Sequence, residues 1–232
     1  MKTRVIRVER SRMEELIAQL GHEDTPRVYT DRNVLVRELF WRRLETLLAQ
    51  SRAAARNRVL DFGGGNGVLT PTLARLYREV VCVDLRTEVV DQLARSEGLT
   101  SVSVRAGELA SLGLGAGQFD TIIAADVLEH IQQLEPLVVE FQRLLVPGGE
   151  LLVSAPSENR VYELGRRVTG YHKPHDHYHP AELVERVIQA RLPLAQRRYF
   201  PVNVPWLAVF SLTRFVKPEG AGSPEGGGPD AG

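Results

Sequence analysis

Cysteine is nearly absent from this chain of 232 residues, since Cys82 is the only one. A single cysteine excludes a disulfide within the chain and favours a reducing compartment, and its place in the apolar run VVCVDL predicts a buried strand thiol. Net charge is also missing, because 29 Lys and Arg balance 29 Asp and Glu. No overall positive field therefore recruits nucleic acid or an anionic membrane.

Long hydrophobic runs are absent as well. No apolar stretch approaches the roughly 20 residues that a membrane-spanning helix needs. The first residues, MKTRVIRVERSRMEEL, carry charges throughout and lack the apolar centre of a signal peptide. Together these absences predict a cytoplasmic protein.

What is present is an alternation of short apolar runs and helical patterns, which begins at Arg58. Such runs, separated by helices, are typical of a parallel sheet that is covered on both faces. Five of the strands are expected at 59–62, 80–84, 102–105, 121–124 and 150–155. The sequence thus predicts three parts, a helical cap (1–57), a doubly wound α/β domain (58–217) and a disordered Gly- and Pro-rich tail (218–232).

The N-terminal part contains one long expected helix, over 31–50, with Asp31 as its N-cap. Leucines recur in it at three- and four-residue steps and predict a buried apolar stripe of Leu35, Leu39, Leu44, Leu47 and Leu48. The arginines fall mostly off that stripe and predict a solvated basic face, made of Arg32, Arg37, Arg42 and Arg43.

The simple alternation ends after the fifth expected strand. Residues 157–179 are polar and rich in Tyr and His, as in an inserted segment. The apolar stretches 194–200 and 206–216 predict an antiparallel hairpin at the sheet edge. Within the second stretch, Trp206 and Phe210 are candidates for weak peripheral contact with a membrane or for contact with a hydrophobic substrate.

The segment VLDFGGGNGVLT places four glycines within five positions, between an expected strand and an expected helix. Such a turn lets backbone amides and a helix N-terminus approach a ligand closely. A dinucleotide fingerprint, G-x-G-x-x-G, that began at Gly63 would require glycine where Val68 stands. The pattern is instead D-x-G-x-G-x-G, which taken alone also fits phosphate binding or tight packing.

An acidic side chain stands at the end of each of the first four expected strands. Asp84 can accept hydrogen bonds from both hydroxyls of a ribose, and Glu108 could accept one from an exocyclic adenine amino group. Asp61 and Asp126 occupy the corresponding places after the first and fourth strands. Because open α/β sheets bind ligands at the carboxyl ends of their strands, the four carboxylates predict a binding site there.

Four segments together resemble the class I S-adenosylmethionine-dependent methyltransferases: LDFGGGNGVLT, VCVDL, FDTIIAADVLEHI and LLVPGGELLVSAP. VLEHI and VPGG are similar to the quinone-biosynthesis and small-molecule branch of that family. The resemblance covers about residues 58–217 and implies a mostly parallel, seven-stranded Rossmann-like sheet, with one antiparallel strand from the last hairpin. It also implies S-adenosylmethionine as cofactor.

The resemblance assigns roles to residues near the glycine loop. Asp61 would order the loop and reach the amino-acid part of the cofactor, and Asp84 would hold the ribose. Glu108, where the family more often has Asp, would meet adenine, and Asp126 would begin the segment between cofactor and acceptor. The complete set of implied cofactor contacts is Asp61, Gly63, Gly65, Gly67, Asp84, Leu85, Glu108, Leu109 and Asp126.

The histidine-rich segment GYHKPHDHYHP, which follows the fifth strand, allows three interpretations. Its histidines and Asp176 are suitable metal ligands, but no second cluster matches them, and no metal is expected. A polar surface loop is the second interpretation. We favour the third, a lid that faces the acceptor, with His177 as general base or hydrogen-bond donor. The other expected lid contacts are Tyr29, His130, Tyr171 and His175.

The turn after the fifth strand bears on the acceptor. Enzymes of this family that methylate nucleobase or glutamine amino groups carry an N/D-P-P-Y turn there, whereas this chain has SAPS at 154–157. We therefore expect methylation of a small-molecule acceptor, at oxygen. Two alternatives are a NAD-dependent oxidoreductase, which Val68 disfavours, and a non-catalytic partner protein that binds the cofactor, which the retained carboxylates disfavour.

Overall fold

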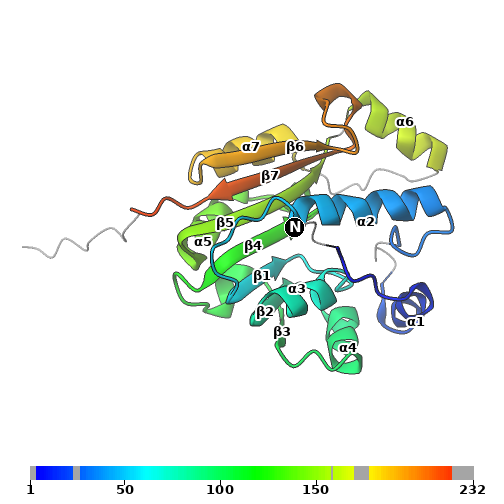
Figure 1. Cartoon of the computed structure of the whole chain (residues 1–232), viewed down its shortest axis with the longest axis horizontal. Helices are drawn as coiled ribbons and strands as arrows, with labels where there is room; N and C mark the ends of the chain where they lie inside the picture. The colour runs from blue at the N-terminus through cyan, green and yellow to red at the C-terminus, as the bar shows by residue number, and fades with distance from the viewer. Residues whose placement is uncertain (1–3, 23–26, 158, 170–177, 221–232) are drawn as a thin grey trace, which may run out of the picture.

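The structure, a computed structural model, contains one seven-stranded sheet with helices on both faces (Figure 1). It describes residues 4–22, 27–157, 159–169 and 178–220. The strands are β1 (Arg58–Phe62), β2 (Glu79–Asp84), β3 (Val102–Ala106), β4 (Phe119–Ala125), β5 (Leu145–Pro156), β6 (Leu194–Phe200) and β7 (Phe210–Val216). The α-helices are α1 (Arg10–Leu20), α2 (Val34–Leu48), α3 (Thr70–Leu76), α4 (Glu88–Ser96), α5 (Leu134–Leu144), α6 (Arg160–Thr169) and α7 (Ala181–Gln189), and the short 3₁₀ turns are η1 (Leu109–Leu112), η2 (Leu128–His130) and η3 (Pro205–Leu207).

The strand order is β3-β2-β1-β4-β5-β7-β6. Strands β1 to β5 pair in parallel, and β7 is antiparallel to both β5 and β6. The predicted Rossmann-like α/β fold and its C-terminal hairpin are therefore confirmed. The order reverses between β1 and β4, which creates a crevice at their carboxyl ends, and the glycine loop follows β1 directly.

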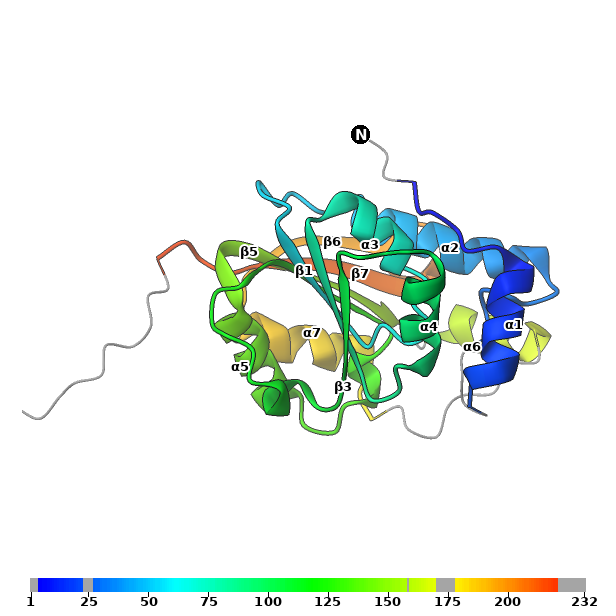
Figure 2. The ribbon, with the colours of Figure 1, turned by 90° about the horizontal axis from the view of Figure 1, so that it is seen from below.

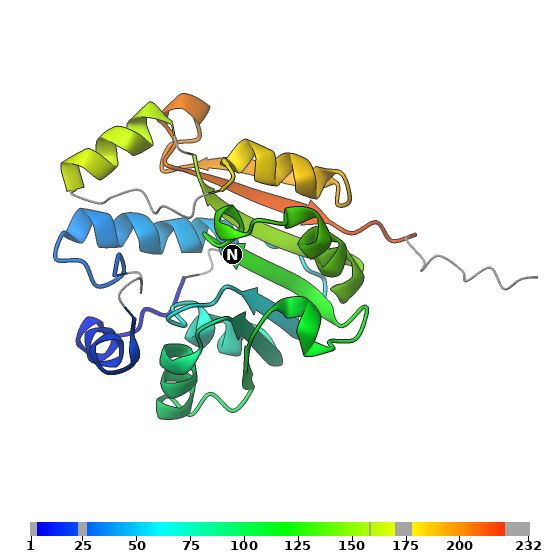
Figure 3. The same ribbon diagram turned by 180° about the vertical axis from the view of Figure 1, so that it is seen from behind.

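Two apolar layers hold the sheet between its helices. Leu44 and Leu47 of α2 and Leu73 of α3 pack on one face, together with Val59 and Ile123 from the strands. Helices α5 and α7 cover the opposite face and can be followed in Figure 3. Helix α1 lies against α4 (Figure 2), through a small cluster of its own. The sheet interior is thus shielded on both sides, and the strand ends are left for the site.

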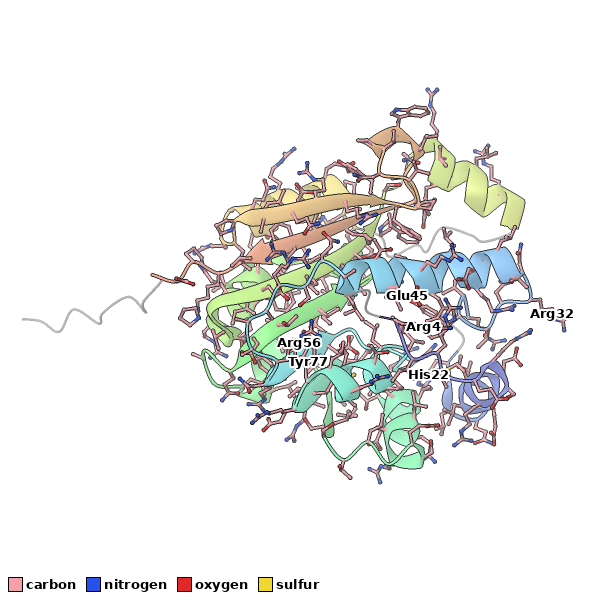
Figure 4. All side chains as sticks on the ribbon, in the orientation of Figure 1. Arg4, His22, Arg32, Glu45, Arg56 and Tyr77 are labelled. Carbon is pink, nitrogen blue, oxygen red and sulfur yellow. The ribbon has the colours of Figure 1, made fainter. Side chains whose placement is uncertain are left out.

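Helix α2 differs from the expectation at its start and on its buried face. Its N-cap is Asn33, whose side chain accepts a hydrogen bond from the Leu35 amide at 2.9 Å, two residues beyond the expected cap. Leu35 is 80% exposed, so it does not belong to the stripe. The expectation for Arg43 was also wrong, because it is 1% exposed, whereas Arg32 projects outward at the end of the helix (Figure 4).

The C-terminal half shows two further differences. Phe210 begins β7 and is 2% exposed, so it cannot contact a membrane as expected, whereas Trp206 lies in η3 and is 70% exposed. Part of the presumed polar insertion is helix α6, and Asn159 ties its start to η3 by donating to the carbonyl of Ala208 at 2.7 Å. The expected tail lies largely outside the described residues, which end at 220.

Two further expectations concerned the single cysteine and the absence of membrane-spanning helices. Cys82 in β2 is fully buried, as predicted for a strand thiol. Across the described part of the chain, none of the helices has the length and apolarity needed to cross a membrane.

Candidate functional site

A cavity of about 230 Å³ lies at the carboxyl ends of β1, β4 and β5. The glycine loop and Asp61 form one wall, and Phe40 and Arg43 of α2 form another. Tyr162 of α6 and Phe210 of β7 add aromatic surface. The cavity therefore joins the predicted glycine loop to helices that precede and follow the parallel sheet.

The glycines of the loop serve different purposes. Gly63 has φ +71°, and a Cβ there would lie 2.4 Å from a methyl carbon of Val127. Gly65 has φ +50° and donates its N–H to Asp84 Oδ2 at 2.8 Å, while a Cβ added there would meet nothing closer than 3.9 Å. Gly63 thus permits a close backbone approach, and Gly65 leaves open space at the cavity.

Asp61 is a buried acid at the base of the cavity. Its residue is 3% exposed, and Oδ2 has no hydrogen-bond partner among the described residues. Burial raises the pKa of its carboxyl to about 7, and the negative charge of Asp84 adds to the effect. An unpaired buried carboxylate is costly, so this side chain is prepared for a cationic partner.

Arg43 brings the opposite charge to the same cavity. Its guanidinium carbon lies 5.0 Å from the ring centroid of Phe40 and 4.5 Å from that of Phe210. One terminal nitrogen donates to the Tyr29 hydroxyl at 2.7 Å, the other forms an ion pair with Asp126, and Nε has no hydrogen-bond partner among the described residues. A planar cation between two rings is held firmly, and one of its buried donors is still unpaired among the described residues.

Asp126 is held in an unusual backbone conformation beside Arg43. Its φ is +54°, and no other non-glycine residue in the described segments has a positive φ. Its N–H donates to the Ser154 carbonyl at 2.9 Å, and the Ser154 hydroxyl donates to its Oδ1 at 3.0 Å. The expected turn at 154–157 is largely strand, since β5 runs to Pro156, and Ser154 of β5 orients the carboxylate that directly follows β4.

Sequence reasoning missed Arg43, although a signal was present. Arg43 stands seven residues after Val36 and four before Leu47, both of them buried, so it falls on the inward face of the helix. Its charge led to the opposite expectation, because arginine is rarely fully buried without a partner. The partners, Tyr29 and Asp126, come from distant parts of the chain.

The residues expected at the site divide into three groups. Those that line the cavity are Tyr29, Asp61, Gly63, Gly65, Asp126 and His130. Those outside its lining are Gly67, which packs toward Val90, Asp84, which binds the Gly65 amide, Leu85, which is exposed, Glu108, which caps η1, and Leu109, which is in the core. His177, Tyr171 and His175 lie outside the described residues.

No metal centre is apparent in the described portion of the chain, where no three His, Cys, Asp or Glu side chains are grouped to hold an ion. His179, the last histidine of the histidine-rich segment, is half-buried, with Nε2 at 3.3 Å from the Gln132 carbonyl oxygen.

Comparison with known proteins decides the family. Residues 60–153 match a family model described as a methyltransferase domain. The ubiquinone biosynthesis O-methyltransferase of Cupriavidus pinatubonensis is 30% identical over 174 residues, which cover 69% of each protein. That of Xanthomonas axonopodis pv. citri is 32% identical over 166 residues, which cover 66% of this chain and 69% of the relative. This chain belongs to the class I S-adenosylmethionine-dependent methyltransferases.

Other relatives match this chain over shorter or more divergent regions. It spans 63% of the length of the ubiquinone biosynthesis O-methyltransferase of Xanthomonas oryzae pv. oryzae, at 33% identity over 151 residues that cover 59% of this chain. The N-methyltransferase NodS from Bradyrhizobium japonicum, solved with S-adenosyl-L-homocysteine, is 22% identical with a TM-score of 0.64, covering 90% of this chain and 99% of NodS. A putative sarcosine dimethylglycine methyltransferase from Galdieria sulphuraria has a TM-score of 0.65 at 16% identity, with the same coverage. Both structures show the same fold.

The methyltransferase cavity fits the cofactor that the family name implies. The amino-acid end of S-adenosylmethionine carries an ammonium and a carboxylate, and the cavity offers a buried acid, Asp61, and a buried cation, Arg43. Each has a polar atom without a hydrogen-bond partner among the described residues. Asp84 adjoins the same loop, because its Oδ2 accepts a hydrogen bond from the Gly65 amide at 2.8 Å. The two buried charges thus match the ammonium and the carboxylate of that end.

Proposed function

We propose that this chain transfers a methyl group from S-adenosylmethionine to an oxygen atom of a small-molecule acceptor. One observation carries the proposal: the cavity that holds Asp61 and Arg43 is also lined by the aromatic residues Phe40, Tyr162 and Phe210. An acceptor with apolar surface fits against such walls. The relatives named ubiquinone biosynthesis O-methyltransferase support oxygen as the methylated atom.

The chain's own contribution to the reaction is alignment. When bound, the cofactor supplies a methyl group that its positive sulfur already activates. Asp61 and Arg43 hold the two charges of the amino-acid end, and Asp84 holds the ribose. The aromatic walls then exclude water and place the acceptor oxygen in line with the methyl group.

A hydroxyl acceptor must also lose its proton. Within the described residues, His130 and Glu129 line the cavity beside Asp126, so the proton can pass to a group of this cluster. His177 remains the general base that we predict from the sequence. A small molecule suits a cavity of about 230 Å³ better than a nucleic acid, which would need a basic surface that the balanced charge does not provide.

Calorimetric titration of the purified chain tests the cofactor first. We expect S-adenosylhomocysteine to bind with a Kd of about 1 μM, while NAD added under the same conditions gives no binding heat. A phenol and catechol panel with labelled S-adenosylmethionine then tests methyl transfer to oxygen. Binding of NAD alone would favour the oxidoreductase, and cofactor binding without turnover on any acceptor would favour the non-catalytic partner protein.

Asp84→Ala is expected to weaken S-adenosylhomocysteine binding by about 2–4 kcal/mol, because two charge-assisted hydrogen bonds to the ribose are lost. The Gly65 amide also loses its acceptor, which loosens the loop. Titration calorimetry measures the change. Asp91→Ala on α4, which removes an exposed carboxylate paired with Arg95, is the matched control and should bind like the unmodified chain. Equal affinities of the two variants would refute the ribose assignment.

A further inference from the structure

Arg43 is a buried cation that needs an anionic partner at all times. It is 1% exposed, and leaving such a charge unpaired inside a protein is strongly destabilising. Tyr29 supplies a neutral oxygen, and burial raises the pKa of that hydroxyl, so it remains neutral beside the guanidinium. In the structure, the only carboxylate paired with Arg43 among the described residues is that of Asp126.

Asp126 depends much less on this ion pair for compensation of its charge than Arg43 does. Its side chain is 24% exposed, so water can solvate the carboxylate if Arg43 turns to another partner. The Ser154 hydroxyl and carbonyl would continue to hold Asp126 in place, through its Oδ1 and its N–H. The ion pair is thus asymmetric, since only one of its members depends on the other for charge compensation.

We propose that Asp126 is a specificity-determining competitor, which shares Arg43 with the carboxylate of a bound ligand and thereby sets how strongly the site prefers ligands that carry one. The inference rests on the proposed function, because it takes the amino-acid end of the cofactor as that ligand. Arg43 lines the cavity, and its buried Nε has no hydrogen-bond acceptor among the described residues, so this donor is left for a second carboxylate. As the ligand carboxylate approaches, Asp126 gives up part or all of its hold on the guanidinium.

Competition by Asp126 and simple positioning of Arg43 by Asp126 predict opposite effects on ligand affinity when Asp126 is removed. If Asp126 only positioned Arg43, its removal would weaken binding of the carboxylate ligand. If it competes, its removal leaves the buried guanidinium without a counterion until a ligand arrives, and the ligand carboxylate then gains more on binding. A ligand without the carboxylate should be indifferent to the change in either case.

Two probes that differ only in the carboxylate test the proposal. S-Adenosylhomocysteine carries the carboxylate, and S-adenosyl-3-thiopropylamine lacks it but keeps the ammonium. Titration calorimetry of both probes on the unmodified chain gives a discrimination ratio, which is the Kd of S-adenosyl-3-thiopropylamine divided by the Kd of S-adenosylhomocysteine. We expect Asp126→Asn to raise that ratio about tenfold by tightening S-adenosylhomocysteine alone, and Arg43→Gln to reduce it to about 1. The double variant should behave like Arg43→Gln, because Asp126 acts only through Arg43.

A ratio that falls or stays constant in Asp126→Asn would overturn the proposal. If that variant does not fold, a crystal structure of the unmodified chain with S-adenosylhomocysteine decides. A ligand carboxylate on the Arg43 guanidinium supports competition, and Arg43 contacting Asp126 alone refutes it. Failure of both probes to bind the unmodified chain would instead refute the proposed function, so the two failures can be told apart.

Discussion

Asp61→Asn is expected to stabilise the ligand-free protein at pH 8 while weakening its binding of S-adenosylhomocysteine. The folded-state pKa of Asp61 is about 7, raised from 3.8 by burial and by Asp84. An acid with a raised pKa contributes stability below its unfolded pKa and loses it as the pH rises through the folded pKa. The free energy lost between pH 4 and pH 8 is about 4 kcal/mol, which the asparagine does not lose.

Chemical denaturation at several pH values measures this effect. The variant should gain stability over the unmodified chain progressively from about pH 4 to pH 7 and then hold a constant advantage of roughly 2–4 kcal/mol. Two parallel stability curves would show that Asp61 is ionised throughout and would contradict the raised pKa. Asp91→Asn on α4, an exposed acid, serves as the control and should track the unmodified chain.

Ligand affinity should depend on pH through the same ionisation of Asp61. The ligand ammonium pairs with ionised Asp61, so below pH 7 binding must release the proton of the carboxyl group, and affinity should rise as the pH approaches 7. Calorimetry in two buffers of different ionisation enthalpy counts the released proton. Asp61→Asn should release none and bind more weakly by about 2–3 kcal/mol, since a charged partner is lost. Stability and binding thus oppose each other at this residue.

Gly63→Ala is expected to destabilise the fold by about 2–5 kcal/mol and to abolish measurable S-adenosylhomocysteine binding. Alanine at φ +71° is strained, which costs about 1–3 kcal/mol. Its Cβ would also lie 2.4 Å from Val127, the residue that follows Asp126, so one of the two backbones must move. Such a shift displaces the loop and Asp126 together. Thermal unfolding and titration calorimetry measure the two effects.

Gly98→Ala separates the strain from the contact. Gly98 has φ +64°, and a Cβ there meets nothing within 4 Å, so the same substitution carries the backbone cost without the collision. We expect it to lose about 1 kcal/mol and to bind normally. If both variants lost the same stability and both still bound S-adenosylhomocysteine, the close approach of Gly63 to Val127 would be unimportant.

The predictable part of the site consists of positions that follow directly from strand ends. Asp61 is the last residue but one of β1, and Asp126 directly follows β4. These strands are paired in the sheet, so the two side chains meet at the same cavity. The periodicity that located the strands also located these residues. Glu108 and Leu85 were equally predictable in position, but both are exposed, and neither lines the cavity.

The sequence by itself determined the alternating sheet, the glycine loop and the carboxylates at the strand ends, because each depends on local spacing along the chain. Only the tertiary structure decided that Arg43 is buried and that Tyr29, Asp126 and Phe210 surround it. These residues come from four separate segments, of which α2 and β7 are elements, and they meet because α2 packs across β5 and β7. A buried charge is acceptable only where distant partners satisfy it, and no local pattern reveals whether they will.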